Sequence, residues 1–71
     1  MITITIARFG QAPQGIKIND GGTVQDALNT AGVEVKSGEK VSVEGVEAEM
    51  SNEVENGDVI SIYTPKGGGY R

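Results

Sequence analysis

The residues of greatest chemical interest are the last seven, Pro65-Lys66-Gly67-Gly68-Gly69-Tyr70-Arg71. Three consecutive glycines have no side chains to bury, and glycine loses more backbone freedom on ordering than any other residue. Because glycine has no Cβ, this backbone can approach another molecule closely. From Pro65 to Gly69 it spans roughly 16 Å when extended at about 3.3 Å per residue. We therefore predict a folded domain over residues 1–64 and a flexible glycine-rich arm over residues 65–71.

The residues of the arm allow two simple interpretations. Gly67 to Gly69 can be no more than a flexible chain end. Alternatively, the arm is a short recognition peptide, in which Tyr70 fills a partner's pocket and Arg71 binds a carboxylate.

The composition argues against catalysis by the chain itself. The sequence has 71 residues and contains neither Cys nor His. A chain of this length is one domain, and without Cys or His it lacks the usual zinc, copper and haem ligands and the common nucleophiles and acid–base groups. No Asp-rich loop of the EF-hand type is present. We expect no catalytic residue, no metal and no cofactor, so the protein is not expected to be an enzyme.

The charge pattern limits the partners. Ten acidic and six basic residues give a net charge of -4, which disfavours nucleic acid. No apolar run reaches membrane-spanning length, and the first residues lack the charged region of a signal peptide. We expect a cytoplasmic protein without a membrane or nucleic-acid partner. We interpret the acidic run between Glu44 and Asp58 as a solvated face rather than a surface for a basic partner, which is the alternative.

The hydrophobic pattern predicts an α+β domain. Ile2, Ile4 and Ile6 alternate with polar residues, and a Gly/Pro turn separates them from a second alternating run at residues 16–18, which together predict a β-hairpin. A helix is expected over about residues 23–32, with Thr23 as N-cap and Gly32 after its last turn. Further strands are expected over residues 40–48, interrupted by a turn at Glu44-Gly45, and over residues 59–64. Residues 33–37 are ambiguous.

A glycine pair, Gly21-Gly22, precedes the expected helix. Glycines at a helix N-terminus can cradle a phosphate. The pair lacks the Gly-x-x-x-x-Gly-Lys pattern of a phosphate-binding loop, so we interpret it as a turn.

The last strand has two faces, and only one can pack against the helix. We place Ile60 and Ile62 inward, because they form the more apolar pair. They join a set consisting of Ile2, Ile4, Ile6, Ile16, Ile18, Val24, Leu28, Val41 and Val43. This choice leaves Val59 and Tyr63 exposed beside the arm, with Phe9 nearby, as a modest docking patch for a partner. Scattered exposed apolar residues without a function are the alternative.

The order of these elements resembles the ubiquitin-like β-grasp family, and within it the small sulfur carriers. The likeness covers nearly the whole chain and rests on residues 22–28, residues 41–45, Asn56-Gly57-Asp58 with the strand that follows, and Gly68-Gly69. It implies a mixed four- to five-stranded sheet packed on one helix. This chain departs from the pattern in having Glu44-Gly45 where these carriers often have Asn-Gly, and in continuing past the glycine pair through Tyr70 and Arg71.

The resemblance also implies a function for the arm. In this family a terminal glycine carboxylate is adenylated by an activating enzyme with ATP. The adenylate is then converted to a thiocarboxylate, or to a thioester and an isopeptide bond. Gly68 and Gly69 would be the activation site, and a processing peptidase would first remove Tyr70 and Arg71. Further partners would be a sulfur-accepting synthase or target proteins. The alternative is a β-grasp interaction module that is never conjugated.

Overall fold

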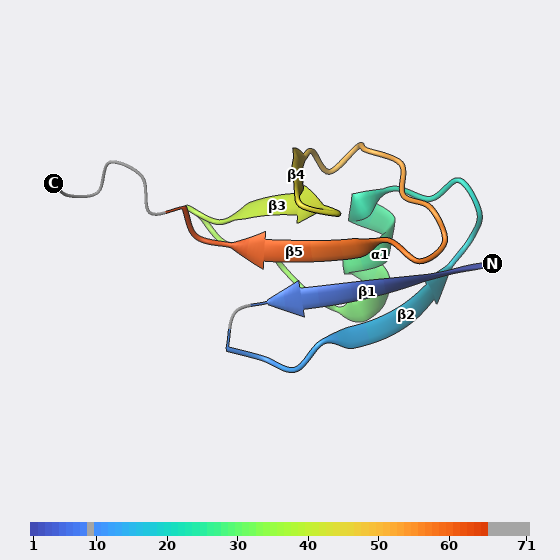
Figure 1. Ribbon diagram of the computed structural model, residues 1–71, viewed down its shortest axis with the longest axis horizontal. Helices are drawn as coiled ribbons and strands as arrows, with labels where there is room; N and C mark the ends of the chain where they lie inside the picture. Colours follow the sequence, from blue (N-terminus) through green and yellow to red (C-terminus); the bar gives the residue numbers. More distant parts are fainter. Residues whose placement is uncertain (9, 66–71) are drawn as a thin grey trace, which may run out of the picture.

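The structure is a computed structural model that describes residues 1–8 and 10–65. It contains one helix and five strands (Figure 1). In chain order these are β1 (Ile2–Arg8), β2 (Gln14–Ile18), α1 (Val24–Ala31), β3 (Lys40–Val43), β4 (Val46–Ala48) and β5 (Val59–Tyr63). None of the described helices is long and apolar enough to cross a membrane.

The five strands form a single mixed sheet in the order β2-β1-β5-β3-β4. β1 and β2 pair as the predicted hairpin, with Ile4 opposite Ile16. The first and last strands, β1 and β5, lie parallel at the centre, with Ile6 opposite Ile60. β3 pairs antiparallel with β5 on one side and with β4 on the other. The only strand edges that remain open in this sheet are those of β2 and β4.

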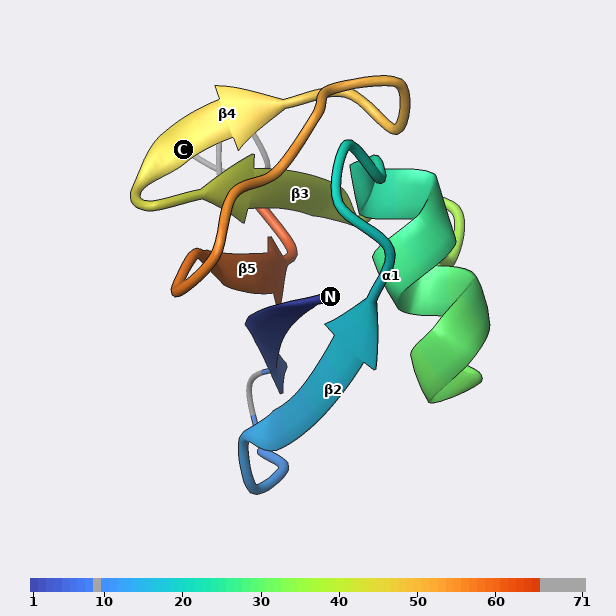
Figure 2. The same ribbon diagram turned by 90° about the vertical axis from the view of Figure 1, so that its right-hand side faces the viewer.

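Helix α1 begins and ends where the sequence predicts. The Thr23 hydroxyl accepts a hydrogen bond from the backbone N–H of Asp26 at 3.3 Å. The Asp26 carboxylate accepts one from the backbone N–H of Thr23 at 3.1 Å, which completes a capping box. At the other end Gly32 has a φ of 73°, the left-handed conformation that glycine adopts without steric cost. The helix lies across one face of the sheet (Figure 2).

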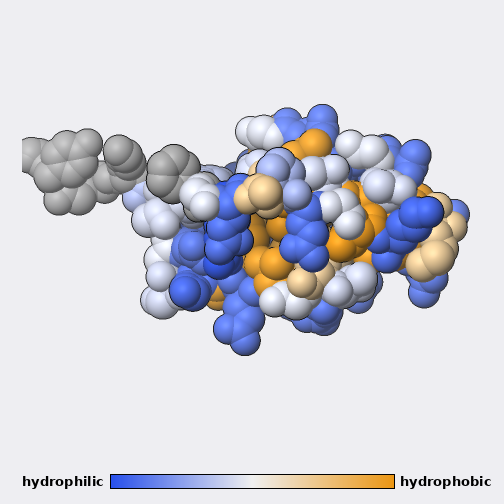
Figure 3. All heavy atoms as spheres, turned by 90° about the horizontal axis from the view of Figure 1, so that it is seen from below, coloured by the Kyte–Doolittle hydropathy of each residue, from blue (hydrophilic) through white to orange (hydrophobic). Residues whose placement is uncertain are grey.

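The core lies between α1 and that face of the sheet. The inward placement of Ile60 and Ile62 is confirmed, since they are 0% and 2% exposed. The other buried apolar residues are Ile4, Ile6, Ile18, Val24, Ala27, Leu28, Val41 and Val54. Ile2, Ile16 and Val43, which were also predicted to face inward, are partly buried against this cluster. A chain this short buries only part of its apolar surface, and Figure 3 shows apolar residues at the surface among hydrophilic ones.

Two connections settle points that the sequence left open. Residues 33–37 form no strand and instead make part of the connection from α1 to β3, from which Val33 and Val35 pack against the core. The turn at Glu44-Gly45 joins β3 to β4 as a two-residue hairpin loop, with φ of 53° and 83°. Positive φ at both positions is what the tightest hairpin loops require.

Candidate functional site

The described part of the chain ends just beyond the central strand. β5 ends at Tyr63, and both Thr64 and Pro65 are exposed. Pro65 has no N–H to give to a neighbouring strand, which suits a position just beyond the sheet. The predicted activation residues Gly68 and Gly69 and the extension Tyr70-Arg71 lie outside the described residues, so the predictions for them stay predictions. The same holds for the division of the chain after residue 64.

Val59 and Tyr63 lie on the sheet face opposite α1, as predicted from the alternation in β5. They are not exposed, however: both are half-buried. The correction follows from the position of β5, because a central strand is flanked on both sides and its neighbours cover its side chains. Val59 lies beside Thr5 of β1, and Tyr63 beside Lys40 of β3.

The proposed docking patch is also less compact than predicted. Val59 begins β5 and Tyr63 ends it, which separates their Cα atoms by roughly 13 Å at about 3.3 Å per residue. Ser61 lies between them on the same face and is half-buried. Of these two residues, Tyr63 is therefore the one at the C-terminal end of β5. Phe9, the third predicted member, lies outside the described residues.

Val59 is held at the start of β5 by Glu44, a role that the sequence did not reveal. The backbone N–H of Glu44 donates to the carbonyl of Val59 at 3.0 Å. In return, the Glu44 carboxylate accepts the backbone N–H of Val59 at 2.8 Å. Glu44 thus occupies a position where turn geometry favours asparagine or glycine, but it reaches a backbone donor across the sheet. The departure from Asn-Gly noted in the sequence has this structural reason.

An ion pair close to the root of the arm was also missed. Arg8 pairs with Glu39 at 3.2 Å and also donates to the carbonyl of Glu34. The Glu39 carboxylate in turn accepts the backbone N–H of Lys36 at 2.8 Å. Both charged side chains are more than four-fifths buried. This cluster ties the α1–β3 connection to the end of β1, where Arg8 lies beside Ile62. The sequence signal was present, since Arg8 continues the inward-facing series of Ile2, Ile4 and Ile6.

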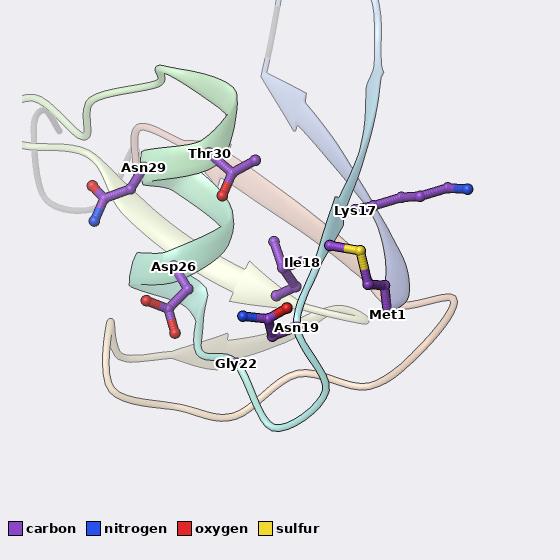
Figure 4. A pocket seen from close by; sticks show the side chains of 8 residues that line it. All are labelled: Met1, Lys17, Ile18, Asn19, Gly22, Asp26, Asn29 and Thr30. Carbon is purple, nitrogen blue, oxygen red and sulfur yellow. The ribbon is translucent and has the colours of Figure 1, made fainter.

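The Gly21-Gly22 pair does not form an anion site. The backbone N–H groups of Val24 and Gln25, which begin α1, donate to the carbonyls of Asn52 and Met50 at 2.9 and 3.0 Å. A Cβ at Gly22 would lie 2.8 Å from Cδ1 of Ile18 and 3.1 Å from the carbonyl oxygen of Asn19, so this turn leaves little room for a side chain. The hollow beside it contains the Asp26 carboxylate, and Figure 4 shows Lys17 pointing away. The interpretation of the pair as a turn agrees with this geometry.

Acidic side chains do not converge on a metal site in the part of the chain that the structure describes. No group of three or more acidic residues there is arranged to hold an ion. Several carboxylates instead close turns, as when Asp58 accepts the backbone N–H of Glu55 at 2.8 Å.

Comparisons with known proteins identify the fold. The crystal structure of SAMP1 from Haloferax volcanii superposes with a TM-score of 0.77 at 18% identity, covering 94% of this chain and 99% of that one. Another structure of H. volcanii small archaeal modifier protein 1 superposes with a TM-score of 0.77 at 16% identity, covering 92% of this chain and 99% of that one. The crystal structure of the thiamine biosynthesis protein ThiS from Geobacter metallireducens superposes with a TM-score of 0.59 at 20% identity, covering 92% of this chain and 99% of that one.

No protein-family model matches the sequence, and a search of curated proteins found no significant match. The structural comparisons confirm the predicted α+β class and the ubiquitin-like β-grasp fold, with one helix on a five-stranded mixed sheet. The predicted structural resemblance to small ubiquitin-like proteins is likewise confirmed, since the similar structures are a small archaeal modifier protein and a thiamine biosynthesis protein. At these identities the likeness establishes the fold.

Proposed function

We propose that this protein is a ubiquitin-like carrier or modifier that is activated at Gly69 once Tyr70 and Arg71 have been removed. One observation carries the proposal. The central strand of a β-grasp sheet ends at Tyr63, and two exposed residues lead from it directly into the glycine-rich sequence. The fold is shared with proteins named as a small archaeal modifier and a thiamine biosynthesis protein.

The chemistry requires little of the chain beyond a free carboxylate and access. The Gly69 carboxylate would attack the α-phosphorus of ATP, so that a carboxyl–phosphate bond forms and pyrophosphate leaves. A sulfur nucleophile would then displace AMP to leave a thiocarboxylate, or an enzyme thiolate would displace it to give a thioester for transfer to an amine. An activating enzyme supplies all the catalytic groups, and the chain itself is proposed to be the substrate and not an enzyme.

The sequence of the arm suits entry into a narrow enzyme channel. Gly67 to Gly69 carry no Cβ, and the backbone from Pro65 to Gly69 spans roughly 16 Å at about 3.3 Å per residue. The carboxylate would thereby reach a buried ATP while the folded domain stays at the mouth of the channel. Tyr70 and Arg71 would block this by size and by holding the Gly69 carbonyl in a peptide bond.

The domain would contribute the docking surface for the activating enzyme. The helix-free face of β5 presents Val59, Ser61 and Tyr63, all half-buried, and Tyr63 is the member next to the arm. We keep Val59, Tyr63 and Phe9 as the proposed docking residues, with Tyr63 expected to contribute most. Later partners would be a sulfur-accepting synthase or protein targets.

Pyrophosphate release tests the proposal directly. Residues 1–69 and residues 1–71 are each mixed with ATP and the adenylating enzyme from the same source. We expect release with residues 1–69 only, and its loss when Gly69→Pro is introduced into that form. Glu55→Gln, an exposed change far along the chain from the arm, serves as the matched control and leaves release unchanged. Equal release from both lengths, or none from residues 1–69, would contradict activation at Gly69.

Mass spectrometry of the reacted protein separates the two outcomes of activation. Replacement of one carboxyl oxygen by sulfur raises the mass by about 16 Da and identifies a sulfur carrier. Covalent adducts at lysines of other proteins identify a modifier. If full-length and truncated chains bind partners equally and neither is adenylated, the protein is instead an interaction module that is never conjugated.

A further inference from the structure

The open edge of β4 adjoins an apolar groove. The groove is a hollow of about 370 Å³ between β3, β4 and the α1–β3 connection. Four apolar residues, Val35, Val41, Ala48 and Met50, line it. Val35 and Met50 are partly buried against the core, so the floor of the groove is an extension of the core surface.

The edge of β4 continues this apolar surface. Val46 is 69% exposed and is one of two large apolar residues with that degree of exposure in the described structure. It lies two residues before Ala48, and alternate residues of a strand share one face. Among the described strands, β4 pairs only with β3. Since antiparallel pairing uses alternate backbone groups on each side of a strand, the outer side of β4 has backbone groups that pair with no other described strand.

The charge around the groove is strongly one-sided. Residues 44–58, which contain β4 and the connection to β5, include six acidic residues and no basic one, whereas the rest of the chain has four acidic and six basic residues. Glu47 and Glu49 belong to this segment and line the groove together with Glu39, whose charge is already paired with Arg8. Lys40, the only basic residue in the lining, is already paired with Glu47 at 3.3 Å.

We propose that the β4 groove is a docking site for an extended basic segment of a partner protein, which adds a strand to β4 and places apolar side chains over Val46 and Ala48. Strand addition supplies backbone hydrogen bonds, and pockets for alternate side chains supply specificity. The acidic surroundings select lysine- or arginine-rich partners and speed their approach. The proposal rests on described residues alone and does not depend on activation at Gly69.

A second copy of this chain is a poor occupant of the groove. Two β4 edges brought together would oppose Glu47 to Glu47 within two acidic segments, and charged residues on short edge strands are a common device against such self-pairing. The hollow beside the other open edge, at β2, is a poor alternative site. Its lining is mainly polar, with Asn19, Asp26, Asn29 and Thr30 (Figure 4), and offers no comparable apolar floor.

A synthetic peptide tests the proposal with the full chain. The probe has seven residues in which lysine alternates with leucine or valine, and its control replaces every lysine by glutamate. Backbone amide shifts of the labelled protein are followed during titration at low ionic strength. We expect saturable shifts at Val46, Glu47, Ala48 and Met50 with the lysine peptide and none with the glutamate peptide. Shifts spread over the whole surface, or absent at β4, would overturn the proposal.

Two double variants test which acidic side chains the binding of the lysine peptide depends on. Glu47→Gln with Glu49→Gln removes two charges at the groove, and Glu53→Gln with Glu55→Gln removes two exposed charges of the same segment outside its lining. We expect binding of the lysine peptide to weaken at least fivefold in the first double variant and less than twofold in the second. Equal weakening would show nonspecific attraction and contradict a defined site.

A polar replacement tests the apolar contact. Val46→Thr keeps the shape and the strand preference but removes apolar surface, and we expect it to weaken peptide binding about threefold without changing the thermal midpoint. Shifts at β4 that depend on protein concentration in the absence of peptide would instead identify self-association, which would also overturn the proposal.

Discussion

The two ends of β5 are held very differently. At its start, Glu44 binds both backbone groups of Val59, and the preceding turn is bonded to β1. There the Asn56 side chain accepts the backbone N–H of Thr3 at 2.8 Å, and Gly57 donates to the carbonyl of Thr3 at 2.8 Å. At its end, Thr64 and Pro65 are exposed, and no hydrogen bond or salt bridge joins them to another described residue.

This contrast separates the residues that make the fold from those proposed to perform the chemistry. The Asn56-Gly57-Asp58 turn is part of the family resemblance, and each of its residues has a structural task at the anchored end. The proposed activation site follows the other end, where the structure imposes no such demand. A change at the anchored end should therefore alter stability, and a change beyond the free end should alter function alone.

The largest effect is expected in the core behind the anchored end. Ile60 is 0% exposed, so Ile60→Ala should lower the free energy of unfolding by about 2–5 kcal/mol through lost burial and a residual cavity. At about 4–8 °C per kcal/mol, the thermal midpoint should fall by at least about 8 °C. The matched change at the free end, Thr64→Ala, should stay within about 0.5 kcal/mol. Comparable losses from both would contradict the contrast.

A smaller effect is expected at the turn itself. Gly57 has a φ of 92°, and a Cβ there would meet nothing within 4 Å. Gly57→Ala should therefore cost about 1–2 kcal/mol through backbone conformation alone. Gly15→Ala is the control, because that position is equally open but has no positive φ. Urea unfolding of the two variants gives the comparison, and equal stability would show that the turn does not constrain the domain.

The Glu44 contact should contribute less. Glu44→Ala removes the acceptor of the Val59 N–H and should cost about 1 kcal/mol, the usual net value of such a hydrogen bond. Glu44→Gln has the same backbone cost at positive φ and keeps an acceptor, so it should retain most of the stability. Hydrogen exchange of the Val59 amide should accelerate in the alanine variant and much less in the glutamine variant. Similar exchange rates in both would assign the effect to the backbone alone.

The sequence predicted the elements well where local chemistry determines them. Thr23, Asp26 and Gly32 define a helix by short-range capping, and the period-two isoleucines define β1, so both elements could be placed before the fold was known. The alternation in β5 also predicted which face Ile60 and Ile62 occupy. These signals act within a few residues, and the β-grasp topology was predicted from the resemblance of their order and motifs to the ubiquitin-like family.

The features that were missed depend on contacts between distant segments. Glu44 and Val59 are brought together by the pairing of β3 with β5, and Arg8 and Glu39 by the α1–β3 connection. The half-burial of Val59 and Tyr63 likewise follows from the central position of β5 in the sheet. No local sequence pattern predicts that position. A charged residue within an inward-facing series, such as Arg8, was the one available signal that a partner lay elsewhere in the chain.

The smallest effect on stability is expected beyond the free end, where the effect on function should be largest. Ending the chain after Pro65 should change the free energy of unfolding by less than about 0.5 kcal/mol, because three of the six residues removed are glycines, which have no side chain to bury. The same truncation should abolish adenylation completely, since Gly69 is gone. Glu44→Ala in residues 1–69 should behave in the opposite way, with lower stability and unchanged pyrophosphate release below its melting temperature. Truncation that destabilises the domain as much as Glu44→Ala would mean that the arm contributes to the fold, and the separation between the two ends of β5 would fail.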